Sequence, residues 1–312
     1  MSDYDPKSLM NLDVCVINAL ELFAEPNTNF PKVDFDRFTR PLVVGSGNAA
    51  ATGRIIFADK DAVFADESTY VDKLESVPAI NGVVLISASG GKHAPTIAQT
   101  AKKRGLKVML LTCNPKSSAG ADVDEVHVFP SRAEPYTYNT STYMAMILAK
   151  TAKQPHHEAK QILEYIKKAV DPALAGYERT FAESKAFFLL VPEQFELIRV
   201  MLITKFVELF GRRIARDVFT SEQAKHATTV IETNKEVFIV FGHPNTMFGQ
   251  ERLNIPLPID AGYAAMIAVG YYVIGKIQVH KPQWFKKSIG KYCNETAKVI
   301  WGRTLPSVVE YP

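Results

Sequence analysis

The segment from residue 85 to residue 96 holds the side chains whose types and spacing best suit chemistry. An apolar run leads into Ser87, Ser89 and Gly90, and Lys92 follows just before a helical pattern. Small side chains let backbone N–H groups approach an anion, hydroxyls add donors, and a helix N-terminus favours negative charge. The segment therefore predicts a phosphate-binding loop in which Lys92 or His93 supplies a cation. The competing interpretation is an ordinary strand-to-helix turn, in which Ser and Gly serve only as caps.

A second loop of similar composition occurs earlier in the chain. Ser46, Gly47 and Asn48 follow the apolar run 41–45 and precede another helix start rich in small residues. Open parallel sheets bind their ligands beyond the carboxyl ends of the strands. Two such loops on one sheet favour an anion site over two unrelated turns.

The earlier loop also permits a different ligand, a dinucleotide. Residues 45–50 fit the pattern G-x-G-x-x-A, and Asp66 follows about 20 residues later. A dinucleotide fold uses one glycine-rich turn for its pyrophosphate and does not require the Ser87 loop. The nucleoside triphosphate motif GxxxxGK[ST] is absent from the sequence. We therefore expect no cofactor, with a nicotinamide-dependent enzyme as an alternative.

The elements that must position these loops form two rounds of the same pattern. Short apolar runs alternate with helical segments, which predicts parallel sheets covered by helices on both faces. A helical connection separates the rounds, and the second round includes a long helix over 194–211. The expected strands are 41–45, 61–65, 82–86, 107–112 and 125–129, followed by 186–191, 214–218 and 236–241.

Length and composition fit this organisation. At roughly 150 residues per domain, 312 residues predict two domains, which we place at 1–154 and 155–312. The first comprises an N-terminal helix and one α/β domain, and the second comprises a connecting helix, another α/β domain and a C-terminal tail. The apolar fraction of 47% is typical of a globular protein.

The net charge, the cysteine pattern and the apolar runs argue against several classes of protein. The net charge is +3 and the basic residues are scattered, which does not indicate a nucleic-acid partner. Three widely spaced cysteines without a metal-binding pattern predict no metal and favour reduced thiols in the cytoplasm. No uncharged apolar run approaches the roughly 18 residues of a membrane span, so no membrane association is expected.

Taken in order, the loops over residues 41–150 resemble those of a sugar-isomerase (SIS) domain. The resemblance rests on Gly45 to Asn48, Glu67-Ser68, Ser87 to Gly90, Glu134, and Thr140-Ser141-Thr142. It implies that Ser87, Ser89 and their loop neighbours hold a sugar phosphate, while Ser46 and residues 140–142 line the same pocket. It also implies two three-layer αβα domains, each with a mostly parallel, flavodoxin-like sheet, and a homodimer formed through helices of these domains.

The second half resembles the isomerase half of glucosamine-6-phosphate synthase, through Thr204-Lys205 with Glu208, and through Glu222 with His226. The resemblance implies that Glu208 moves a proton between C1 and C2 of the sugar. It implies that His226 assists ring opening from a neighbouring subunit, with Lys205 as a further catalytic candidate and Glu222 in a supporting, substrate-binding role.

The chemistry implied is aldose–ketose isomerisation of a sugar 6-phosphate through an enediol. Such a reaction needs a base to lift an acidic C–H proton, and a carboxylate with a raised pKa can serve. A bifunctional phosphoglucose/phosphomannose isomerase is our expectation. The alternatives are a phosphosugar-binding protein of this family without catalysis and a glucosamine-phosphate deaminase-like isomerase.

Overall fold

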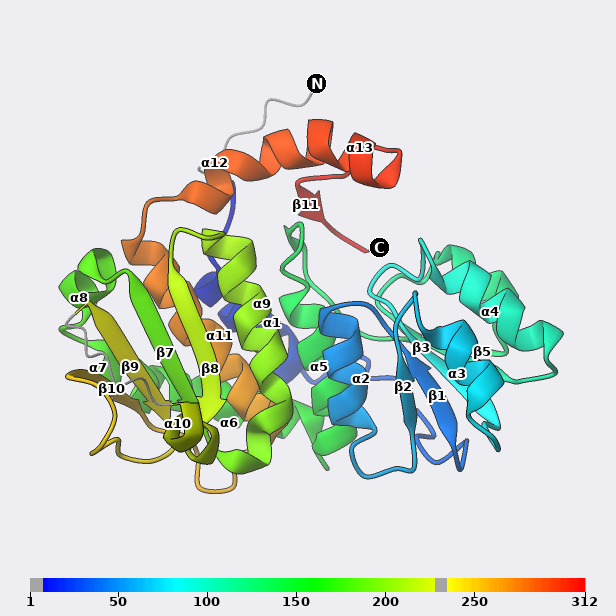
Figure 1. Ribbon diagram of the computed structural model, residues 1–312, viewed down its shortest axis with the longest axis horizontal. Coiled ribbons are helices and arrows are strands. Elements are labelled where there is room, and N and C mark those ends of the chain that lie inside the picture. Colours follow the sequence, from blue (N-terminus) through cyan, green and yellow to red (C-terminus); the bar gives the residue numbers. More distant parts are fainter. Residues whose placement is uncertain (1–7, 228–234, 312) are drawn as a thin grey trace. The chain divides into compact units, whose positions relative to one another are not determined.

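The computed structural model describes residues 8–227 and 235–311, which form two compact units (Figure 1). The N-terminal unit contains residues 21–132, 141–159 and 310–311. Of the described residues, the C-terminal unit contains 8–20, 133–140, 160–227 and 235–309. Each unit is therefore assembled from separate stretches of the chain, and three helices continue from one unit into the other. These helices are α1 (Leu12–Ala24), α5 (Thr140–Thr151) and α6 (Pro155–Tyr165).

The N-terminal unit is built on a five-stranded parallel sheet in the order β2-β1-β3-β4-β5. This is the flavodoxin-like order, in which the chain reverses direction across the sheet between β1 and β3. The strands are β1 (Pro41–Val44), β2 (Val63–Ala65), β3 (Gly82–Ile86), β4 (Val108–Thr112) and β5 (Glu125–Val128). All five lie where the sequence predicts them, because their apolar runs are short and bounded by polar or glycine residues.

Helices connect these strands and cover the sheet. They are α2 (Asn48–Ile56), α3 (Tyr70–Ser76), α4 (Ala94–Lys103) and the 3-10 helix η2 (Ser118–Asp122). Strands β3 and β4 are buried along their whole length. The sheet centre and the apolar faces of α3 and α4 form the core of this unit.

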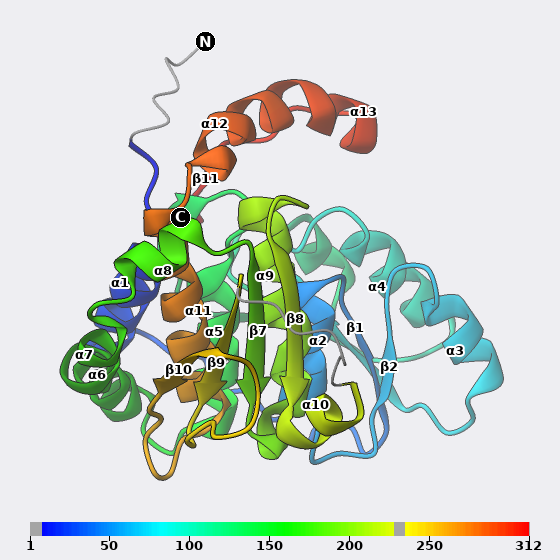
Figure 2. The same ribbon diagram turned by 60° about the vertical axis from the view of Figure 1, so that its left-hand side comes forward.

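The C-terminal unit contains a four-stranded parallel sheet in the order β10-β9-β7-β8 (Figure 2). Its strands are β7 (Ala186–Val191), β8 (Ala215–Thr220), β9 (Glu236–Phe241) and β10 (Glu251–Ile255). This order repeats that of the first four strands of the N-terminal sheet. The repeat confirms the predicted fold class, two three-layer units with parallel sheets, although β10 was not predicted.

Long helices pack on this second sheet. The segment predicted as one helix over 194–211 begins with 3-10 helix η4 (Glu193–Ile198) and continues as α9 (Arg199–Phe210). Helix α11 (Tyr263–His280) is buried along most of its length. The remaining elements are η3 (Ile166–Val170), α7 (Asp171–Leu174), α8 (Glu178–Glu183) and α10 (Ser221–Ala227).

A C-terminal arm completes the unit. It comprises α12 (Trp284–Lys291), the π-helical turn η5 (Tyr292–Thr296) and α13 (Ala297–Trp301). The chain then returns as β11 (Val308–Val309), which pairs antiparallel with β6 (Glu134–Pro135). Across the described part of the chain, no helix combines the length and apolar character that a membrane crossing requires.

Candidate functional site

The Ser87 loop joins β3 to α4 at the carboxyl end of the N-terminal sheet. The Ser87 hydroxyl accepts a hydrogen bond from the Gly90 amide at 3.1 Å, and the Ser89 hydroxyl accepts one from the Gly91 amide at 3.3 Å. The two hydroxyls thus hold the backbone in a tight turn. Both side chains are half-buried, whereas Lys92 is exposed. The loop has the compact backbone that close approach to an anion requires.

Gly90 is the position in this loop that admits no side chain. Its φ is +59°, and a Cβ placed there would lie 2.3 Å from Cβ of Ser117. The loop therefore packs against the start of η2, where the Gly90 carbonyl accepts a 3.0 Å hydrogen bond from the Ala119 amide. Ser117 was not singled out in the sequence, because its contact with Gly90 joins residues far apart in the chain.

The Gly45 loop follows β1, on the other side of the point where the strand order reverses. Ser46 donates a hydrogen bond to the Glu67 carboxylate, which lies after β2. Gly47 has a φ of +54° and precedes Asn48, the first residue of α2. The side-chain oxygen of Asn48 is buried and has no hydrogen-bond partner among the described residues. A ligand donor at the start of α2 would satisfy it.

Asp66, which a dinucleotide site would use for a ribose, has a structural role. Its Oδ1 atom accepts four hydrogen bonds of 2.7 to 3.0 Å from the amides and hydroxyls of Ser68 and Thr69. These bonds lower the pKa of Asp66 to about 2. The carboxylate therefore caps the start of α3, and the geometry favours the anion interpretation of the Gly45 loop over a dinucleotide site.

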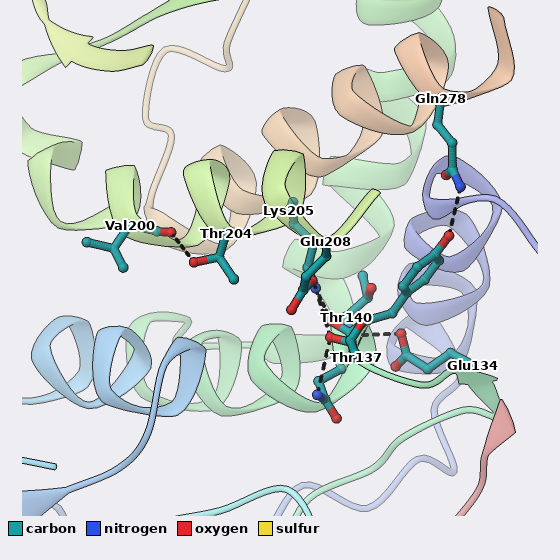
Figure 3. A network of polar contacts seen from close by, with 10 residues as sticks. Glu134, Thr137, Thr140, Val200, Thr204, Lys205, Glu208 and Gln278 are labelled. Carbon is teal, nitrogen blue, oxygen red and sulfur yellow. Dashed lines mark hydrogen bonds and ion pairs between the residues drawn. The ribbon is translucent and has the colours of Figure 1, made fainter. Parts of the chain in front are cut away.

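Lys205 is the central cation of the C-terminal unit. Its side chain on α9 is fully buried, with no exposed surface. The ammonium donates to the carbonyls of Thr137 at 3.0 Å and Tyr138 at 2.6 Å, and to the Glu208 carboxylate at 2.6 Å (Figure 3). A lysine has three N–H donors. All three are used within the protein, so the ammonium holds a turn and a carboxylate together.

The turn that Lys205 holds is strained. Thr137 has a φ of +79° and Asn139 a φ of +44°, conformations that non-glycine residues rarely adopt and that cost of order 1–3 kcal/mol each. The Thr137 hydroxyl is buried and has no hydrogen-bond partner among the described residues. Such strain persists where surrounding contacts over-determine the backbone, here the two carbonyls bound by Lys205.

Two further residues fix both sides of this turn. The Glu134 carboxylate accepts a 2.7 Å hydrogen bond from the Thr140 amide, at the first residue of α5 (Figure 3). On α11, Gln278 donates to the Tyr138 hydroxyl at 2.9 Å and accepts from the Leu12 amide at 2.9 Å. Glu134 and Gln278 therefore act on the backbone and on Tyr138, and both are buried.

Glu208, the ion-pair partner of Lys205, is partly exposed and borders a pocket. Its side chain is 20% exposed, and it lines a pocket of about 400 Å³ together with Thr137. Burial raises the pKa of Glu208 above its usual value, and the nearby Lys205 ammonium opposes this rise. A carboxylate with a raised pKa, bordering a cavity and held by a fixed cation, has the properties of a general base.

The structure distributes the remaining predicted residues between the units. Ser141 and Thr142 are buried on α5 in the N-terminal unit, and the Ser141 hydroxyl accepts a 3.1 Å hydrogen bond from the Arg132 amide. Thr140 belongs to the C-terminal unit together with Lys205, Glu208, Glu222 and His226.

Within the C-terminal unit, Glu208 and His226 lie at opposite ends of β8. Glu208 is near the end of α9, which precedes β8, whereas α10 carries His226 and follows it (Figure 2). Six strand residues separate the two ends by roughly 20 Å. Glu222, also on α10, is exposed and forms an ion pair with Lys225 at 2.5 Å. One C-terminal unit alone does not bring His226 to Glu208.

Sequence reasoning missed the aromatic wall of the pocket. Trp284, Phe285 and Tyr292 line it from α12 and η5, and none of them was a candidate site residue. Arg213 also lines the pocket, with its guanidinium 5.3 Å from the Trp284 ring centroid. Nothing local in the sequence links these residues, because the contacts join the end of α9 to the C-terminal arm.

Comparison with known proteins identifies the fold. No model of a known protein family matches the chain, and no curated protein matches it. Solved structures do match it. A glucosamine-6-phosphate deaminase from Thermotoga maritima aligns with a TM-score of 0.62 at 16% identity, over 86% of this chain and 92% of that one. The chain has the double sugar-isomerase fold.

Two other structures with this sugar-isomerase fold align similarly. The C-terminal domain of glucosamine-fructose-6-phosphate aminotransferase from Francisella tularensis gives a TM-score of 0.59 at 12% identity, covering 86% of this chain and 93% of that one. A tagatose-6-phosphate ketose/aldose isomerase from Escherichia coli gives 0.59 at 14% identity, covering 88% of each chain. At these identities the similarity establishes the sugar-isomerase fold.

Proposed function

We propose that the protein binds a sugar 6-phosphate and interconverts its aldose and ketose forms through an enediol. In this proposal the Ser87 and Gly45 loops of the N-terminal unit hold the phosphate. Glu208 of the C-terminal unit moves the proton between C1 and C2. The named activities of the solved structures with this fold, a ketose/aldose isomerase and a glucosamine-6-phosphate deaminase, act on sugar phosphates and support this assignment.

The observation that carries the proposal is the setting of Glu208. Aldose–ketose exchange requires a base that removes a C–H proton and returns it to the neighbouring carbon. Glu208 borders a cavity, its pKa is raised by burial, and Lys205 fixes its position at 2.6 Å. In this proposal Lys205 is a positioning residue, since its three N–H groups are already bonded to protein acceptors.

The buried hydroxyl of Thr137 supports the same site. It has no partner among the described residues, and Thr137 lines the pocket beside Glu208. A buried hydroxyl that lacks a partner is costly unless a ligand or water satisfies it. We assign it to a hydroxyl of the bound sugar. A phosphoglucose/phosphomannose isomerase reaction is the specific activity that we propose to test first.

We further propose that the working enzyme is a homodimer in which His226 comes from the neighbouring subunit. The separation of Glu208 from His226 within one C-terminal unit supports this arrangement, because a shared site would then need a second copy. His226 is exposed at the carboxyl edge of the sheet and is accessible for such a contact. Glu222, which pairs with Lys225, is placed beside it in a supporting role.

The test of sugar-phosphate binding is thermal stabilisation by hexose and hexosamine 6-phosphates. A ligand at 100 times its Kd contributes about 2.7 kcal/mol to the free energy of unfolding. The variant Ser87→Ala/Ser89→Ala should bind the same ligand about 1–3 kcal/mol more weakly, because it loses hydroxyls that order the loop. Unchanged affinity in this variant would remove the loop from the site. Stabilisation of wild type without any C2 proton exchange would identify a binding protein instead of an isomerase.

A further inference from the structure

The pocket beside Glu208 contains a cation, Arg213, that has no acidic partner among the described residues. Arg213 is the only Lys or Arg among the described residues that line this pocket. Its guanidinium forms no ion pair or hydrogen bond within the described part of the chain. The Lys205 ammonium differs in this respect, because its three N–H groups are bonded to Glu208 and to two backbone carbonyls. Arg213 is therefore the cation that remains available to a ligand.

Arg213 is also held in place. Its side chain is exposed, and its guanidinium carbon lies 5.3 Å from the centroid of the Trp284 ring, which lines the same pocket. The ring electrons attract a guanidinium that lies over the face of an indole. The N–H donors of the guanidinium lie in its own plane, so they stay open to an acceptor. Trp284 thus restricts the cation without using its donors.

The other polar groups on the pocket wall can also donate hydrogen bonds. Thr137, Ser288 and Tyr292 have hydroxyl groups, and Trp284 has an indole N–H. Glu208 is the one carboxylate among the described lining residues. Such a wall suits a ligand with oxygen acceptors beside the carbon from which Glu208 would remove a proton.

The proposed reaction creates negative charge on one of these oxygens. The C2–H bond of the aldose breaks, its proton goes to the Glu208 carboxylate, and the electron pair moves through C1 to the carbonyl oxygen. Return of the proton to C1, with transfer of the O2 proton to O1, gives the ketose. A fixed cation beside the developing oxyanion lowers the barrier, because it stabilises the transition state more than the uncharged carbonyl.

We infer that Arg213 is a catalytic residue of the proposed reaction, and that its guanidinium donates to the substrate oxygen that becomes negative when Glu208 removes the proton. In this inference Trp284 is a positioning residue, because its ring holds the guanidinium. The inference rests on the proposed function, since no such charge forms without proton exchange at C2. Glu208, Arg213 and Trp284 all belong to the C-terminal unit.

The first test compares two ligands that differ in charge at the reacting end. D-arabinonate 5-phosphate has a carboxylate at the position of the enediolate, and D-arabinitol 5-phosphate has an uncharged hydroxymethyl group there. Calorimetry gives the Kd of each for Glu208→Gln, because the amide is uncharged, as Glu208 is once it holds the substrate proton. We expect the carboxylate to bind at least about tenfold more tightly, and this ratio should fall at least about tenfold when Arg213→Met is added.

The second test is kinetic, with Glu208 intact. Arg213→Met should lower kcat for C2 proton exchange at least about tenfold, with a smaller change in KM, because the lost interaction forms only as the charge develops. Arg213→Lys should recover part of this loss, since it retains the charge but not the planar group that stacks on Trp284. Arg212→Met is the matched control, because Arg212 is an exposed neighbour that does not line the pocket.

The possible outcomes separate the inference from the proposed function. If wild type exchanges the C2 proton, but Arg213→Met keeps both kcat and the ligand ratio, the inference is overturned and the proposed function stands. Equal losses in Arg212→Met and Arg213→Met would also overturn it, because they would reflect general charge and not contact with the oxygen. If wild type binds neither ligand and exchanges no proton, both the inference and the proposed function are wrong.

Discussion

At the scale of single residues, Lys205 shows how one buried cation organises the candidate site. The sequence indicated that Lys205 and Glu208 share a helix face, since they are three residues apart. It contained no sign that the ammonium also binds the carbonyls of Thr137 and Tyr138, because that contact spans 67 residues or more. The strained turn at Thr137 was not predicted either, since a threonine in the sequence does not indicate a positive φ.

Lys205→Met should destabilise the protein strongly. The substitution leaves the Glu208 carboxylate and two backbone carbonyls without their buried donor, which costs about 3–5 kcal/mol. The free energy of unfolding from urea titration measures this loss. The control is Lys225→Met, which removes another Lys–Glu pair whose partners are 48% and 62% exposed. That pair contributes about 0–1 kcal/mol. Equal losses in the two variants would refute the organising role of Lys205.

The pH dependence of catalysis should report Glu208. A general base must be ionised, so turnover should decrease as the pH falls through the pKa of Glu208. Burial places that pKa above the ordinary 4.5 of a glutamate. The acid limb of kcat/KM, which reports ionisations of the free enzyme, is therefore expected above pH 4.5. A profile that stays flat down to pH 4 would show that another group is the base.

At the scale of elements, the sequence predicted the strands that carry loops better than those at the sheet edge. Strands β1 and β3 are short apolar runs followed by glycine and serine. The sequence therefore predicted both that these segments are strands and where they end. Strand β10 was missed because its residues, Glu251 to Ile255, include a Glu, an Arg and an Asn, and only Leu253 and Ile255 are buried. Edge strands bury fewer side chains, and their pattern is correspondingly weak.

The C-terminal arm was predicted only in part. A C-terminal tail was expected, whereas the structure has a helical segment that starts at Trp284 and passes through a π-helical turn at Tyr292–Thr296. Such a turn changes the helical periodicity, which explains why a regular 3.6-residue pattern did not reveal it. Tyr292, the first residue of this turn, lines the pocket.

Gly90→Ala tests the packing of the Ser87 loop. A Cβ at this position would lie 2.3 Å from Cβ of Ser117, and the backbone has a φ of +59°. We expect a loss of roughly 1–3 kcal/mol in unfolding free energy, together with weaker phosphosugar binding. Gly91→Ala is the control, because its Cβ would meet only ordinary contacts at 3.5 Å or more. If both variants were equally stable, the close approach to Ser117 would not constrain the loop.

At the scale of the whole molecule, the duplicated parallel sheet was predictable and the composition of the site was predictable only in outline. Two rounds of strand and helix are visible in the sequence because apolar periodicity is local. The way in which Glu134, Thr137 and Thr140 join the C-terminal unit depends on contacts between distant segments, which local patterns do not encode. The phosphate loops and Glu208 were identified only through composition and family resemblance.

The two units make separable predictions if binding and chemistry are divided between them. Ser87→Ala/Ser89→Ala should weaken affinity, because it alters the phosphate loop of the N-terminal unit. Glu208→Gln should retain affinity, because glutamine preserves the shape and can still accept a hydrogen bond from Lys205. It removes only the charge that accepts the substrate proton.

The most direct measurement is deuterium exchange at C2 of hexose 6-phosphates in wild type and Glu208→Gln, combined with ligand titration of both proteins. The account predicts exchange in wild type and a decrease in kcat of at least about 100-fold in the variant, the usual scale for a positioned base, with little change in Kd. Wild-type exchange in Glu208→Gln would contradict the account, because the proton would then be moved by a different residue.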